Sequence, residues 1–301
     1  MELWIPITIF AAFMQNLRSA LQKHLKGRLS TSGIAFIRFL YGAPIAVAYM
    51  LGLVLLGNYS VPSVTFWFVV FAIIGGLAQI GATALLVYLF SFRNFAVGVA
   101  FSKTETIQTA IFGFIILGET VSPMATIAVL ISMVGIVILS VTQPAGGVTA
   151  ILKQSLEWTT VIGIASGALF ALASITYRAA ALSLGSGDYI MRAAFTLACV
   201  TVFQTAIMAL YIQVREPAQT AAVFREWRIA VLVGISGVLG SAGWFTAMTL
   251  QNATYVKALG QIELLFTFAT TYLWFKEETS QNELVGIFLI ASGIFILVLS
   301  P

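Results

Sequence analysis

The sequence predicts an all-α integral membrane protein with ten transmembrane helices in two inverted five-helix repeats. Composition, ten long apolar segments and an internal repeat support this prediction. The 301 residues are 60% hydrophobic and 9% charged, and the mean hydropathy is +1.01, whereas soluble domains average about 25% charged residues. So few charged side chains cannot cover a water-soluble protein of this size. We therefore expect a multi-pass protein of the cell (inner) membrane.

Ten apolar segments are long enough to span a bilayer. A span needs about 20 residues, because a rise of about 1.5 Å per residue must cross about 30 Å of hydrocarbon. The expected spans are 4–21, 33–56, 66–90, 96–117, 123–141, 159–177, 189–211, 229–250, 254–275 and 284–299. Ser122 and Asp188 are residue types favoured at helix N-caps, and each precedes a predicted span. Ser280 and Glu283 have capping-box spacing. Pro44 predicts a kink in the second span.

An offset of 158 residues aligns the second half of the chain on the first. It pairs Glu105 with Glu263, Thr109 with Thr267, Glu119 with Glu277, and Gly135 with Gly293. We expect a first five-helix repeat at 1–143, a connecting loop at 144–157 and a second repeat at 158–301. Five is an odd number, so the second repeat would enter the membrane from the opposite face.

Four charged side chains fall inside the fourth and ninth predicted spans, namely Lys103, Glu105, Lys257 and Glu263. A charge at bilayer depth costs about 2.5–3.5 kcal/mol on insertion scales, so such groups line cavities or find partners. The two glutamates occupy equivalent positions, which fits a structural or gating role, contact with a substrate amine, or proton transfer. The lysines have no lysine counterparts, and this asymmetry fits contact with a substrate carboxylate. Snorkelling to the interface is the alternative for both lysines.

Uncharged side chains complete the candidate substrate-binding set. Gln108 and Gln261 could contact substrate or form hydrogen bonds between helices. Tyr88 and Trp244 could form walls of a pocket, or face the core or the lipid. Arg38 and Arg192 lie near the ends of their spans and are expected to snorkel. Four glycines recur every three residues in the eighth span and predict close helix packing: Gly234, Gly237, Gly240 and Gly243.

Several classes of function have no supporting motif. The chain carries no Gly-rich phosphate loop, His-Glu-x-x-His motif, cysteine cluster or Ser nucleophile elbow. We therefore expect no enzyme activity, no catalytic residues, no cofactor and no metal. The 15 basic residues are scattered, which argues against nucleic acid as a partner. The expected partners are a small-molecule substrate and the lipid bilayer, with transport driven by a proton or substrate gradient.

Over residues 4–299 the sequence resembles the drug/metabolite transporter superfamily, in its ten-helix EamA-type branch. The resemblance is carried by Arg38-Phe39, by Glu105 with Gly118-Glu119, and by Gly135, and the second half repeats it with Glu263, Glu277 and Gly293. Family members often have proline after the glutamates of the fourth and ninth helices, where this chain has Thr106 and Leu264. The resemblance implies a transporter with a central cavity between the two repeats. The family moves amino acids, sugars and other metabolites.

These observations predict a secondary transporter of small polar metabolites, amino acids or related compounds, working by alternating access. Export is the direction that the family resemblance favours. The alternatives are a membrane-embedded lipid-handling protein and a non-transporting helical scaffold. Basic residues gather in the loops after the odd-numbered spans, which places both termini outside, whereas the family resemblance implies cytoplasmic termini.

Overall fold

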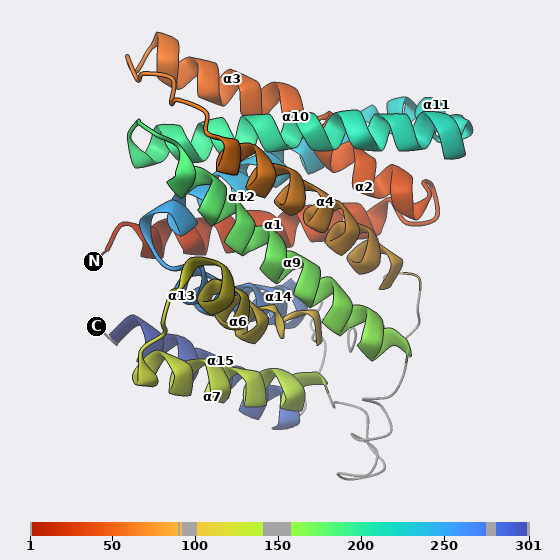
Figure 1. The fold of residues 1–301 in the computed structure, drawn as a ribbon. Coiled ribbons are helices and arrows are strands. Elements are labelled where there is room, and N and C mark those ends of the chain that lie inside the picture. The colour runs from red at the N-terminus through yellow and green to blue at the C-terminus, as the bar shows by residue number, and fades with distance from the viewer. Residues whose placement is uncertain (1, 90, 92–100, 141–157, 275–280, 300–301) are drawn as a thin grey trace.

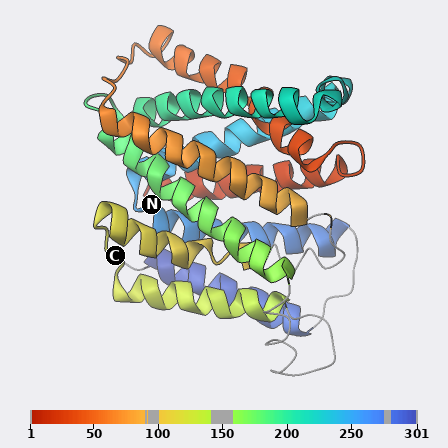
Figure 2. The same ribbon diagram turned by 45° about the vertical axis from the view of Figure 1, so that its right-hand side comes forward.

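The computed structural model describes residues 2–89, 91, 101–140, 158–274 and 281–299, and these residues form helices joined by short turns (Figure 1). The helices are α1 (Trp4–His24), α2 (Thr31–Leu40), α3 (Gly42–Leu55), α4 (Phe66–Leu89), α6 (Glu105–Leu117), α7 (Pro123–Ser140), α9 (Trp158–Ser183), α10 (Tyr189–Arg215), α11 (Pro217–Arg225), α12 (Trp227–Leu250), α13 (Ala253–Gly260), α14 (Ile262–Trp274) and α15 (Gln281–Leu299). The two ends of the chain lie at one end of the bundle, and the turn between α1 and α2 lies at the other (Figures 1 and 2).

The all-helical class is confirmed for the described residues, and the helices have the character of membrane spans. Five helical stretches are long and apolar enough to cross a bilayer: Thr31–Leu55, Phe66–Leu89, Trp158–Ser183, Tyr189–Arg215 and Trp227–Leu250. Large apolar side chains cover the outside. Phe66, Phe114, Ile115 and Phe288 are each between 64% and 74% exposed. Extensive exposed apolar surface indicates contact with a nonaqueous environment or a partner.

Three predicted spans are interrupted rather than continuous. In the second, Tyr41 separates α2 from α3, because Pro44 has no N–H to donate to the carbonyl of Leu40. In the fourth, residues 103–104 form a turn and α6 begins only at Glu105. In the ninth, α13 ends at Gly260 and α14 begins at Ile262. The last two interruptions form without proline after the glutamates.

The predicted helix caps are confirmed where the structure describes them. The Ser122 hydroxyl accepts a hydrogen bond from the backbone N–H of Ala125 at 3.2 Å. The Asp188 carboxylate caps α10 by accepting from the backbone N–H of Ile190 at 3.0 Å. The capping box at Ser280 lies outside the described residues. Several helices extend past the predicted ends, and α11 occupies a region that the sequence analysis left without an element.

Small residues allow the long helices to approach closely. α12 runs along α1, α9 runs along α4, and α15 runs along α7. The glycines of α12 face their neighbours as predicted: a Cβ at Gly234 would lie 2.6 Å from the Cβ of Tyr41, and one at Gly243 would lie 2.8 Å from the Cβ of Ala11. Side chains at these positions would force the helices apart.

The contact between α7 and α15 is reciprocal. A Cβ at Gly135 would lie 2.6 Å from the carbonyl oxygen of Gly286, and one at Gly293 would lie 2.6 Å from the carbonyl oxygen of Ala128. The two glycines differ by 158 residues, and so do the two contacted carbonyls. Each helix therefore uses the same surface to meet the other, as in a two-fold interface.

Gly135→Ala should destabilise the protein by about 1–3 kcal/mol, the usual cost of overpacking, because the new methyl group meets backbone that cannot rotate away. Gly52→Ala is the matched control, since a Cβ at Gly52 has no atom within 4 Å. The control should be neutral or slightly stabilising. Thermal melting in detergent measures both, and equal melting temperatures for the two variants would contradict the close packing.

Candidate functional site

Two buried ion pairs join the first half of the chain to the second. Lys103 Nζ lies 2.6 Å from Glu263 Oε2, and Lys257 Nζ lies 3.6 Å from Glu105 Oε1. All four residues are between 7% and 9% exposed. The shorter pair is a charge-assisted hydrogen bond, whereas the longer pair is an ion contact beyond hydrogen-bond distance. Each lysine therefore takes its counterion from the other half of the chain.

The interruptions of the two helices place these charges. Glu105 and Glu263 lie in the first turns of α6 and α14, and Lys257 lies in the last turn of α13. Partial positive charge at a helix N-terminus favours a carboxylate, and partial negative charge at a C-terminus favours an ammonium. Lys103 lies in the turn just before α6. Breaking the helices therefore supplies dipoles that help to hold three of the four charges in the interior.

Gln15 and Trp244 surround the ion pairs. Gln15 Nε2 donates to Glu263 Oε2 at 2.9 Å, and Trp244 Nε1 donates to Gln15 Oε1 at 3.1 Å. Lys257 Nζ lies 4.7 Å from the centroid of the Trp244 ring, within cation–π range. A Cβ at Gly260 would collide with that ring. The helix end at Gly260 thus makes room for the indole beside the lysine.

The structure brings together six of the eight predicted site residues. Gln261 belongs to the group, and its Nε2 donates to Thr106 Oγ1 at 3.0 Å across the two halves. Gln108 instead faces α9, where its Nε2 lies 3.5 Å from the carbonyl oxygen of Ile164. Tyr88 is 42% exposed near the C-terminal end of α4, outside the group. The Thr109 hydroxyl donates to the carbonyl oxygen of Glu105 and not to its carboxylate.

Two arginines are buried near this group, and neither was predicted to be there. Arg18 is 3% exposed and is attracted by both Glu263 and Glu105. Its spacing from Gln15 and Gln22, three and four residues, marks a polar face on α1 that could have revealed it. The expectation that Arg38 snorkels is wrong, since it is 5% exposed and donates to Thr83 Oγ1 at 2.9 Å. Arg192 is half-buried in the first turn of α10.

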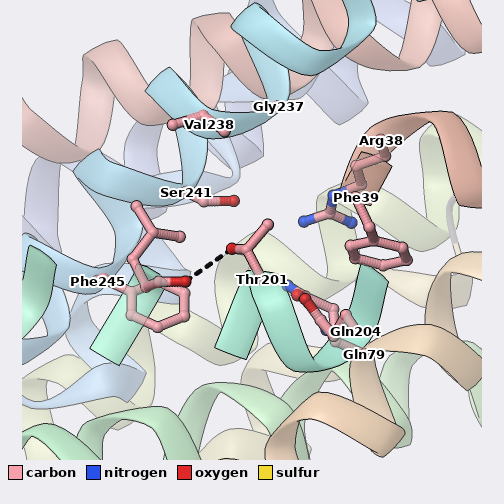
Figure 3. A pocket seen from close by; sticks show the side chains of 10 residues that line it. Arg38, Phe39, Gln79, Thr201, Gln204, Gly237, Val238, Ser241 and Phe245 are labelled. Carbon is pink, nitrogen blue, oxygen red and sulfur yellow. Dashed lines mark hydrogen bonds between the residues drawn. The ribbon is translucent and has the colours of Figure 1, made fainter. Parts of the chain in front are cut away.

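A small cavity lies beside Arg38 (Figure 3). Its volume is about 10 Å³, which is room for about one water molecule. The Arg38 guanidinium faces this space, with Thr201 and Ser241 on the other side. Gln79 and Gln204 also line it, and Gln204 Nε2 donates to Gln79 Oε1 at 2.9 Å. Polar groups therefore line this part of the interior.

A much larger depression opens at the end of the bundle that holds the two termini. Its volume is about 580 Å³, and its lining includes Trp4, Thr120, Gln251, Asn252 and Tyr255. Tyr255 belongs to α13, the same short helix that carries Lys257. The depression therefore reaches the short helix that carries Lys257.

Among the described residues, no group of three or more His, Cys, Asp or Glu side chains could hold a metal ion. The buried groups of the site are cations, carboxylates, amides and an indole. Such groups can form ion pairs and hydrogen bonds with polar or charged ligands. The chemistry that the site supports is ion and hydrogen-bond recognition.

Comparisons with known proteins support the fold and leave the function open. No protein-family model matches the chain, and no curated protein matches it either. Among solved structures, 29 chains match, so the fold is an established one. One of them, a protein crystal structure, has a TM-score of 0.71 with 17% sequence identity and covers 98% of this chain and 96% of its own. At that identity the match concerns the fold alone.

Gln15→Leu should lower the free energy of unfolding by about 1–3 kcal/mol, because Glu263 loses a donor and the Trp244 N–H loses its acceptor. Asn16→Leu is the matched control, since it makes the same kind of change one position along α1, on a different face. The control should change stability by less than about 1 kcal/mol. Chemical denaturation in detergent would compare them, and equal losses would show that Gln15 has no special role.

Proposed function

We propose that the protein is a secondary transporter of small polar metabolites and a member of the drug/metabolite transporter superfamily. The observation that carries this proposal is the pair of buried ion contacts across the two halves, each at a helix interruption. In membrane transporters, interrupted helices near the middle of the bilayer supply charged and dipolar groups to the substrate site.

The proposed architecture is ten transmembrane segments in two inverted five-helix repeats. Helix pairing supports it, because α1 packs on α12 and α9 packs on α4. In each case the first helix of one proposed repeat meets the third helix of the other. The reciprocal contact between α7 and α15, the fifth helices, is what a two-fold axis between the repeats would produce. Two such repeats can exchange roles between states open to opposite faces.

The ion pairs give substrate binding a physical basis. Removing one partner from a buried ion pair costs about 3–5 kcal/mol, so the pair opens only if new partners replace the old ones. A substrate carboxylate would take the place of a glutamate beside Lys103 or Lys257. A substrate amine or a proton would take the place of a lysine beside Glu105 or Glu263. A zwitterionic metabolite supplies both replacements at once.

A depression at one end of the bundle fits the same proposal. Its volume is about 580 Å³ and its lining includes Tyr255 of α13, whereas the cavity by Arg38 has a volume of only about 10 Å³. We propose that the described conformation opens more toward the end that holds the termini. A gradient of the substrate or of protons across the membrane would drive transport, and the proposed direction is export.

Two other classes of function fit the fold. A lipid-handling protein would need a lateral opening with head-group contacts, and a scaffold would need no buried charges at its centre. The charged interior favours transport, because a scaffold does not need two lysines and two glutamates at its centre and their burial costs free energy. We therefore keep transport as the proposal.

Lys257→Ala should reduce substrate flux by tenfold or more, because Lys257 contributes to the proposed binding site and balances Glu105. The measurement is counterflow in proteoliposomes with a panel of labelled amino acids and organic acids. The control is Lys26→Ala, which removes a lysine in the turn between α1 and α2, outside the membrane interior. Wild-type flux in the Lys257→Ala variant would remove Lys257 from the proposed binding site, and no flux of any metabolite in the wild type would sink the proposal and leave the scaffold.

A further inference from the structure

Two buried arginines meet beside α12. A Cβ at Gly237 would lie 3.4 Å from Arg38 Cγ and 3.6 Å from Arg18 Cδ, so both side chains pass the same glycine. Arg18 comes from α1 and Arg38 from α2, and they are 3% and 5% exposed. The two like charges repel each other. Holding them together in an apolar interior requires compensation by negative charge or by hydrogen-bond acceptors.

The described residues supply little of that compensation. Arg38 donates to Thr83 Oγ1 and lies 5.4 Å from the centroid of the Phe39 ring. Arg18 Nε is buried with no acceptor among the described residues. The ion pairs of the described chain include neither arginine. The nearby carboxylates of Glu263 and Glu105 are each held by a lysine. A guanidinium offers five N–H donors, so most of those on the two arginines remain available.

The charge balance of the interior also shows that positive charge is left uncompensated. The buried charged residues of the described chain are Arg18, Arg38, Lys103, Lys257, Glu105 and Glu263. Four of these are cations and two are anions, which leaves an excess of two positive charges. The lysines and glutamates balance each other, so the excess belongs to the two arginines. A ligand that carries negative charge would bring the interior closer to neutrality.

We propose that Arg18 and Arg38 bind the anionic group of the substrate, a carboxylate or a phosphate, so that the transported class is small organic anions. This inference rests on the proposed function and narrows its substrate class. The planar fork of arginine suits a carboxylate or phosphate because it can donate two parallel hydrogen bonds. Thr201, Gln204 and Ser241 line the cavity that Arg38 faces and offer further polar contacts (Figure 3).

The present cavity is too small for such a ligand, so binding requires the helices around it to separate. Gly237 and Val238 of α12 form one wall, and Arg38 and Phe39 of α2 form another. The glycine face of α12 toward α1 and α2 allows these helices to slide without side-chain interlocking. Arg18 passes Gly237 beside Arg38, and its charge also interacts with the carboxylates of Glu263 and Glu105. One substrate could therefore place its anion at the arginines and its remaining polar groups near the lysines and glutamates.

The first test compares ligands that differ in charge but hardly in shape. The melting temperature of the purified full chain is measured with succinate, its uncharged diamide succinamide or inorganic phosphate at matched ionic strength, because a ligand of the native state raises it. We expect succinate or phosphate, or both, to raise it in a concentration-dependent way, and succinamide to have little effect. A response to succinate alone assigns the site to carboxylates, and a response to phosphate alone assigns it to phosphates. Equal responses to succinate and succinamide, or no response to either anion, would overturn the proposal.

Variants then locate the response. Arg18→Gln should weaken anion binding by about tenfold or more, since it removes charge-assisted hydrogen bonds. Arg28→Gln, which changes an exposed arginine paired with Glu226, should leave it intact. If Arg18→Gln fails to fold, Arg18→Lys keeps the charge and loses the fork, and should weaken binding less. Full anion binding in a folded Arg18→Gln or Arg18→Lys variant would contradict the assignment.

The two proposals can fail separately. Anion stabilisation without flux of any metabolite would retain this site and remove the transport function. Flux of metabolites that carry neither carboxylate nor phosphate, without an anion response, would retain transport and remove the anion site.

Discussion

The structure depends on the pairing of buried charges between the two halves of the chain. A lone lysine or glutamate in an apolar interior would cost several kcal/mol, whereas Lys103 with Glu263 and Lys257 with Glu105 compensate each other. Each pair takes one member from each half, so the halves cannot separate locally without exposing unpaired charge to a low-dielectric surrounding. The same pairs therefore hold the centre together, and in the proposed mechanism a ligand that brings its own charges would open them.

Helix interruptions lower the free-energy cost of burying these charges. Ending α13 at Gly260 and starting α14 at Ile262 turns helix termini toward the centre, and the late start of α6 at Glu105 does the same in the first half. The dipoles at these termini favour the signs of charge found there. Gly260 also leaves space for Trp244, which covers Lys257 with an aromatic face. The helix ends in the interior therefore lie where the buried charged side chains lie.

The helical class and most helix bounds could be predicted from the sequence, because long apolar runs and caps such as Asp188 are local signals. The 158-residue offset also identified Gly135 and Gly293, each of which lies against the backbone of the other's helix in the contact between α7 and α15. Which lysine meets which glutamate could not be predicted, since that depends on how distant helices pack. The burial of Arg38 could not be predicted, because its position near the end of a span does not reveal which helices cover its side chain. Arg18 was missed although its spacing from Gln15 and Gln22 is visible in the sequence.

A double-mutant cycle between positions 103 and 263 tests the central claim most directly. Lys103→Met and Glu263→Gln each remove one charge and keep most of the side-chain volume, and the double variant removes both. If the pair is formed, each single variant should be destabilised by about 3–5 kcal/mol, and the double variant should be destabilised by clearly less than the sum, because no charge then lacks its partner. Additive losses in the free energy of unfolding would show that the two charges do not meet and would contradict the account.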